Sequence, residues 1–134
     1  MKRGFTIIEL LVVMAIIGML ASIILVVFSG IQAKSRDTRR MQDVRELKKA
    51  LSLYYVNTNR FPEAATAVAV DGTDPITAAL VAEGAIPNFA GDPVTPNFDY
   101  FYQSSGVASY TITFCLETDS IPNYTQGCSN TIRP

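Results

Sequence analysis

The chain has 134 residues and a formal net charge of −1 at pH 7, which allows one small globular domain beside a long helix but not two globular domains. It contains no histidine, the side chain that most often acts as a general base and most often binds zinc. The composition therefore argues against an enzyme, and we assign no catalytic, cofactor-binding or metal-binding residues.

The first predicted element is a membrane-spanning helix near the N-terminus. No charged residue occurs from Leu10 to Phe28, and this length matches the ~20 residues that a helix needs to cross a bilayer. The run exceeds the apolar region of an ordinary secretory signal, which has about 7–15 residues. A single membrane anchor is therefore expected.

Glu9 stands at the start of this apolar stretch and needs a compensating partner. An ionised acid at the bilayer centre costs about 2.5–3.5 kcal/mol. One interpretation is that Glu9 reaches headgroup water and is helped by the positive end of the helix dipole. The other is that the residues up to Gly4 are removed, so that a free amine on Phe5 pairs with Glu9 in an assembled state.

Residues 4–13 (GFTIIELLVV) and 15–18 (AIIG) form a long motif with fixed spacing. This motif resembles the class III signal of type IV prepilins and of type II secretion pseudopilins. It implies that a prepilin peptidase cleaves after Gly4 and methylates the new amine of Phe5, and that Glu9 supports assembly.

Beyond the apolar stretch, the periodicity predicts an amphipathic continuation of the same helix. Apolar residues recur at threes and fours, namely Met41, Val44, Leu47, Leu51, Tyr54 and Tyr55. No proline separates the two patterns, so one helix ending near residues 57–59 is expected. The expected organisation is a cleaved leader at 1–4, a transmembrane and assembly helix at 5–31, and an amphipathic half-helix with a globular pilin-like head at 32–134.

A collar of basic residues follows the apolar stretch and consists of Lys34, Arg36, Arg39, Arg40, Arg45, Lys48 and Lys49. We expect mainly a solvated helix face, with lipid headgroups or the acidic heads of other subunits as alternative partners and nucleic acid as an unlikely one. The positive-inside rule would place this collar in the cytoplasm. The family resemblance and the cysteine pair favour the opposite orientation, which we adopt.

The remaining chain predicts an α+β fold, in which the long helix packs on a small antiparallel sheet. Residues 61–96 are expected to be a loop-rich connector containing a short helix capped by Asp74 and closed by Gly84. Its acids are expected to be solvated rather than to bind calcium. Alternating residues at 98–103 and 110–114 predict an antiparallel hairpin whose aromatic face belongs to the core.

Two cysteines, Cys115 and Cys128, enclose a short polar loop near the C-terminus. A disulfide between them would contribute about 3 kcal/mol and would place the head outside the cytoplasm. A pair of reduced, buried thiols is the alternative.

The resemblance implies a structural subunit of a type IV pilus-like filament, with a secretion pseudopilin preferred. A pilin for adhesion, motility or DNA uptake is the alternative, and a tethered binding or enzymatic domain is a distant third. The implied partners are further copies, minor pilins, the prepilin peptidase, the inner-membrane assembly platform and the lipid bilayer. The implied location is the inner membrane, with a cytoplasmic N-terminus and the head outside, and then a periplasmic or extracellular filament.

Overall fold

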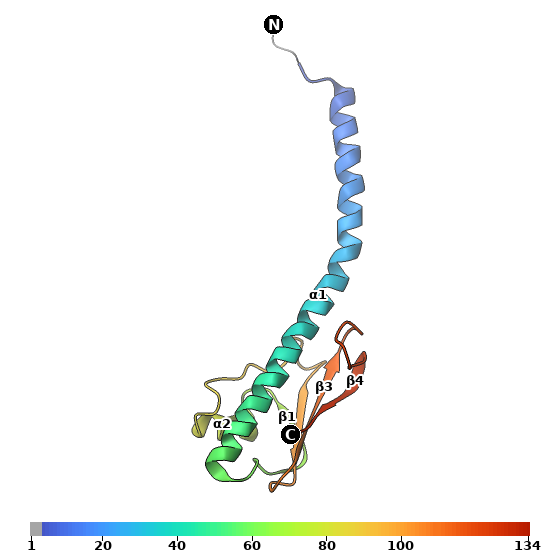
Figure 1. The fold of residues 1–134 in the computed structure, drawn as a ribbon. Coiled ribbons are helices and arrows are strands. Elements are labelled where there is room, and N and C mark those ends of the chain that lie inside the picture. The colour runs from blue at the N-terminus through green and yellow to red at the C-terminus, as the bar shows by residue number, and fades with distance from the viewer. Residues whose placement is uncertain (1–3) are drawn as a thin grey trace. The chain divides into compact units, whose positions relative to one another are not determined.

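The computed structural model describes residues 4–134, apart from the side chains of residues 25 and 26. The part of the predicted leader before Gly4 lies outside this range. Within it, the elements follow the order α1, β1, α2, β2, β3, β4 (Figure 1). The chain divides into two compact units, one ending at Ala33 and one beginning at Lys34. A long N-terminal helix and a small antiparallel sheet confirm the predicted α+β fold.

Helix α1 runs from Ile7 to Thr58 and joins the apolar and amphipathic patterns without interruption. It ends where Asn59 takes a left-handed backbone conformation, with φ of 57°, which asparagine tolerates better than most residues. The hydroxyl of Thr58 donates to the carbonyl of Tyr54 over 2.8 Å and so satisfies one of the last helical acceptors. The prediction of one helix ending near residues 57–59 is confirmed.

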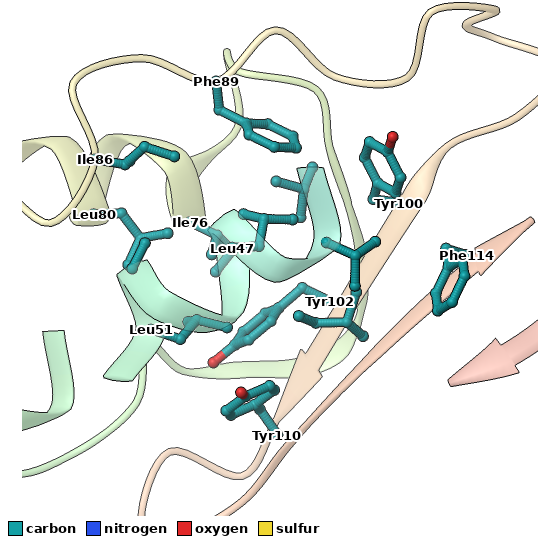
Figure 2. Packing of buried hydrophobic residues seen from close by; sticks show 14 of the residues in the cluster. Leu47, Leu51, Ile76, Leu80, Ile86, Phe89, Tyr100, Tyr102, Tyr110 and Phe114 are labelled. Carbon is teal, nitrogen blue, oxygen red and sulfur yellow. The ribbon is translucent and has the colours of Figure 1, made fainter. Parts of the chain in front are cut away.

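The core of the second unit lies between α1 and the sheet. Leu47 and Leu51 of α1 face the aromatic side chains of Tyr102 and Tyr110 (Figure 2). Apolar residues from the connector close the core around them, namely Ile76, Leu80, Ile86 and Phe89. Burial of this stripe is what holds α1 to the head, because apolar area removed from water contributes about 25 cal/mol per Å².

Four strands form one antiparallel sheet in the order β1-β2-β3-β4. Their bounds are β1 Ala64–Val70, β2 Tyr100–Ser104, β3 Tyr110–Leu116 and β4 Gly127–Ile132. Tyr102 of β2 lies opposite Ile112 of β3, which confirms the predicted hairpin. Along β2 the buried Tyr100 and Tyr102 alternate with the exposed Phe101, as expected for a sheet with one covered face.

Neither edge strand is predicted from the sequence patterns. Strand β1 lies inside the segment expected to be a loop-rich connector, and no element is predicted at β4. Four of the seven residues of β1, AATAVAV, are alanine, and β4, GCSNTI, contains glycine and asparagine, all of which are depleted in strands. Their pairing with β2 and β3 overrides this weak local preference.

Helix α2, Pro75–Ala82, has the predicted cap. The Asp74 carboxylate accepts from the backbone N–H groups of Ile76 and Thr77 at 2.9 Å each, which satisfies donors that the first turn leaves free. Gly84 follows the helix in a left-handed conformation with φ of 67°, the usual place for glycine.

Candidate functional site

The first unit presents an uncovered apolar surface. All described side chains from Ile7 to Gln32 are exposed, and the helix contains an 18-residue window apolar enough to cross a membrane, of which 0% is buried. The Ser22 hydroxyl donates to the carbonyl of Met19 over 2.8 Å and so needs no partner outside the helix. Exposed apolar surface of this extent requires lipid or other protein to cover it.

The predicted assembly residues lie at the start of this helix. Phe5 is 79% exposed and precedes the first helical residue, Ile7. Glu9 is in the first turn, and its Oε2 accepts hydrogen bonds from the backbone N–H of Thr6 at 3.0 Å and from the Thr6 hydroxyl at 2.8 Å. In return, the Glu9 N–H donates to Thr6 Oγ1 at 3.3 Å.

This reciprocal pair is a capping box, in which a Thr at the N-cap and a Glu three residues later satisfy each other's backbone donors. This local partner is missing from both sequence-based interpretations of Glu9, which invoke headgroup water or a free amine on Phe5. The spacing Thr-x-x-Glu at positions 6 to 9 is the signal that would have identified Thr6. The single chain thus gives Glu9 a local partner, and it does not bring Glu9 together with Phe5.

The two cysteines are brought together within the second unit. Cys115 of β3 and Cys128 of β4 form a disulfide with an S–S distance of 2.01 Å. Within residues 4–134, no group of three or more His, Cys, Asp or Glu side chains is arranged to hold a metal ion.

A buried ionic network lies where α1 enters the second unit. Arg40 is 0% exposed, and its Nε and Nη2 donate to the two carboxylate oxygens of Asp92 at 2.5 and 3.1 Å. Its Nη1 donates to Asp37 at 2.9 Å and to Glu117 at 2.7 Å. The guanidinium carbon also lies 4.6 Å from the centre of the Phe98 ring, within range of a cation–π interaction.

Further contacts extend the network to the segment after β3. Asp37 is 0% exposed and accepts from the backbone N–H groups of Glu117 and Thr118 at 2.9 Å each. Arg36 donates to both carboxylate oxygens of Glu117 at 2.8 and 2.5 Å. We name the group Arg36, Asp37, Arg40, Asp92 and Glu117 the Arg40 network. It ties α1 to two segments that are distant in sequence.

The Arg40 network shifts the pKa values of three of its members, Arg36, Arg40 and Glu117. Burial by itself would lower the pKa of Arg40, but hydrogen bonds to Asp92 and Glu117 outweigh this effect and raise the pKa. Hydrogen bonding from Arg36, assisted by Arg40, lowers the pKa of Glu117 to about 2. Arg36, Arg40 and Glu117 are therefore charged at neutral pH, as a buried ion cluster requires.

These contacts correct the expectation of a solvated collar. It is wrong for Arg40, which is fully buried, and for Arg36, which is paired with Glu117. Arg45 and Lys49 of the same collar are exposed, as expected. The network cannot be predicted from local sequence patterns, because its helical members contact partners that are far away along the chain. The separation is 52 positions for Arg40 and Asp92 and 77–81 positions for the contacts with Glu117.

The fold and the N-terminal site together define a protein anchored in a membrane by one apolar N-terminal helix. Residues 1–25 match the family described as "Prokaryotic N-terminal methylation motif". The chain is 28% identical over 133 residues to type II secretion system core protein G of Pectobacterium carotovorum subsp. carotovorum, covering 96% of this chain and 84% of that protein.

Two further relatives are similar in sequence to the chain. Type II secretion system core protein G of Escherichia coli (strain K12) is 30% identical over 96 residues, covering 69% of this chain and 66% of that protein. Type IV major pilin protein PilE1 of Neisseria gonorrhoeae is 33% identical over 70 residues, covering 52% of this chain and 42% of that pilin. No solved structure matches the chain significantly. The chain belongs to the family of type IV pilins and type II secretion pseudopilins.

Proposed function

We propose that the chain is the structural subunit of a type IV pilus-like filament, and specifically a pseudopilin of a type II secretion system. The observation that carries this proposal is the methylation motif at residues 1–25, which continues into an apolar helix whose described side chains are all exposed. Proteins of this family are structural, and we propose no enzymatic role for the chain.

Processing is proposed to remove residues 1–4 and to leave Phe5 as a methylated N-terminus. The surroundings of Gly4 support recognition by a peptidase rather than a packing role, because a Cβ at this position would meet no atom of the non-adjacent described residues within 4 Å. A glycine that the fold does not need is consistent with a glycine that a processing enzyme selects.

Glu9 is proposed to pair with the Phe5 amine of a neighbouring subunit. Thr6 occupies only Oε2 of the carboxylate, and among the described residues Oε1 accepts no hydrogen bond. A carboxylate can accept several hydrogen bonds at once. The capping box therefore orients Glu9 and leaves one oxygen open to a charged partner.

Assembly is proposed to exchange lipid contacts of residues 5–31 for contacts between helices of neighbouring subunits, with residues 32–134 outside the membrane. Lipid tails are as apolar as leucine, so the exchange depends on packing and on polar pairs such as Phe5 with Glu9. Heterologous contacts that do not close generate a filament. The proposed partners are further copies, related minor pilins, the prepilin peptidase and an inner-membrane assembly platform.

The proposed orientation places the N-terminus in the cytoplasm and the head outside it. The disulfide supports the same orientation, since disulfides persist mainly in oxidising compartments.

A surface pilin is the second candidate. The match to the Neisseria pilin and the disulfide between β3 and β4 favour it. Deleting the gene separates the two functions: a pseudopilin is required for the release of secreted proteins, whereas a pilin is required for surface filaments.

The proposal is tested by mass spectrometry of the N-terminus in sheared filaments and in the membrane fraction. We expect a methylated Phe5 N-terminus in filaments of the wild type and no filaments from Glu9→Ala. Glu46→Ala is the matched control, because Glu46 is an exposed glutamate on the same helix, and it should assemble normally. An intact Met1 in the wild-type membrane fraction would contradict the proposal.

A further inference from the structure

The loop between β3 and β4 contains a sequence that the filament function does not use. Asn123-Tyr124-Thr125 has an asparagine, a residue other than proline and then a threonine, which is the acceptor pattern for N-glycosylation. No other asparagine in the sequence is followed two positions later by serine or threonine. The pattern is only three residues long, so it indicates a modification site only where the structure exposes the asparagine.

The loop presents the two ends of this pattern outward and its middle inward. Asn123 and Thr125 are exposed, whereas Tyr124 is half-buried and its ring lies 5.3 Å from that of Phe114 in the core. Asn123 has a left-handed backbone with φ of 70°, and Tyr124 N–H donates to the carbonyl of Ile121 over 3.3 Å. The asparagine thus stands in an exposed turn anchored by its neighbour.

Neither the asparagine nor the threonine side chain of the pattern is hydrogen-bonded in the described structure. The carboxamide of Asn123 and the hydroxyl of Thr125 have no hydrogen-bond partner among residues 4–134, although Thr125 is held through its backbone. Its N–H donates to Asn130 Oδ1 at 3.1 Å, and its carbonyl accepts from Asn130 Nδ2 at 2.8 Å. Asn130 is the contrast, because it is buried and its amide is occupied.

We propose that Asn123 is an N-glycosylation site. Its Nδ2 would attack the anomeric carbon of an oligosaccharide carried on a polyprenyl diphosphate. The new C–N bond forms as the sugar–diphosphate C–O bond breaks, polyprenyl diphosphate leaves, and Nδ2 loses a proton. This inference rests on the proposed function in one respect, namely that the head lies outside the cytoplasm. A glycan there would project into solvent without displacing the core.

The test is intact-mass and peptide mass spectrometry of the full chain purified from its native host. We expect one modified form, with the added mass on the peptide that contains Asn123. Asn123→Gln and Thr125→Val should lose the added mass completely, whereas Thr125→Ser, which keeps the hydroxyl, should retain it. Asn97→Gln is the matched control, because Asn97 is exposed but lacks a hydroxyl residue two positions later.

Three outcomes would overturn the inference: an unmodified wild-type chain, an added mass that persists in Asn123→Gln, or one that persists in Thr125→Val. Non-reducing electrophoresis checks that each variant keeps the disulfide and therefore its folded loop. The two proposals fail differently. Unmodified subunits with a mature Phe5 N-terminus would contradict only glycosylation, whereas an uncleaved Met1 would contradict the filament function.

Discussion

Arg40 depends on its carboxylate partners because water does not reach it. Its guanidinium is fully buried and donates four hydrogen bonds to Asp37, Asp92 and Glu117. Removing one partner from a buried ion cluster leaves the remaining charges uncompensated, which is far more costly than removing an exposed pair. The planar fork of arginine also matches the two oxygens of Asp92, which lysine cannot reproduce.

We expect Arg40→Met to destabilise the head by about 3–5 kcal/mol. The substitution keeps most of the side-chain volume and removes only the charge and the donors. The measurement is the urea unfolding midpoint of the full chain in detergent, followed by near-ultraviolet circular dichroism. Arg39→Met is the control, since Arg39 is exposed and lies 3.9 Å from Asp43, and it should change stability by less than about 0.5 kcal/mol. Equal effects of the two variants would refute a special role for Arg40.

Two buried tyrosines of the core, Tyr102 and Tyr110, differ in whether their hydroxyl group is hydrogen-bonded. Tyr102 donates its hydroxyl proton to the carbonyl of Pro62 over 2.8 Å, whereas the buried Tyr110 hydroxyl has no partner among the described residues. Tyr102→Phe should cost about 1–3 kcal/mol, because it leaves a buried carbonyl unpaired. Tyr110→Phe should be neutral or stabilising. The same urea titration measures both, and a clear loss of stability in Tyr110→Phe would show that its hydroxyl has a partner.

The segment that follows β3 is held on α1 by ion pairs between Glu117 and two arginines. Glu117 receives hydrogen bonds from Arg36 and Arg40, and these lower its pKa from 4.5 to about 2. A carboxylate whose pKa is lower in the folded state stabilises the fold above its unfolded pKa, and this contribution is lost as the pH falls through the folded value. The contribution of Glu117 should therefore disappear between pH 4.5 and pH 2.

Glu117→Gln should lower stability at pH 7 and should make stability less dependent on pH within that window. Urea unfolding on both sides of the window measures the change. Glu83→Gln is the control, because Glu83 is exposed and its side chain makes no hydrogen bond or ion pair with the described residues. If both variants keep the acid dependence of the wild type, the pairing of Glu117 does not contribute to folding.

Sequence patterns predict the elements that local chemistry determines and miss those that depend on distant contacts. The long helix, the Asp74 cap and the β2–β3 hairpin follow from periodicity and from turn residues, which act within a few positions. Strands β1 and β4 form because they pair with β2 and β3, and their own residues show little preference for a strand. The Arg40 network is the extreme case, because its arginines resemble an ordinary charged helix face until the fold supplies Asp92 and Glu117.

For the whole molecule, the division at Ala33 and Lys34 predicts that the head folds without the anchor. Its buried apolar residues begin at Met41, so a fragment of residues 34–134 should be soluble and as stable as the head of the full chain. A fragment of residues 41–134 is the matched control. It keeps every core residue but lacks Arg36, Asp37 and Arg40, and it should be less stable by about 3–5 kcal/mol. Urea unfolding compares the two, and equal midpoints would mean that the network contributes nothing.

The Arg40 network also has a mechanical consequence for a subunit held in a filament by its N-terminal helix. Tension enters such a subunit along α1, and covalently it would reach residue 92 or residue 117 only after passing through the intervening chain. The hydrogen bonds that Arg36 and Arg40 donate and that Asp37 accepts carry the tension there directly. A pull on the helix is therefore shared at once by the connector and by the disulfide-closed loop, before any strand is strained.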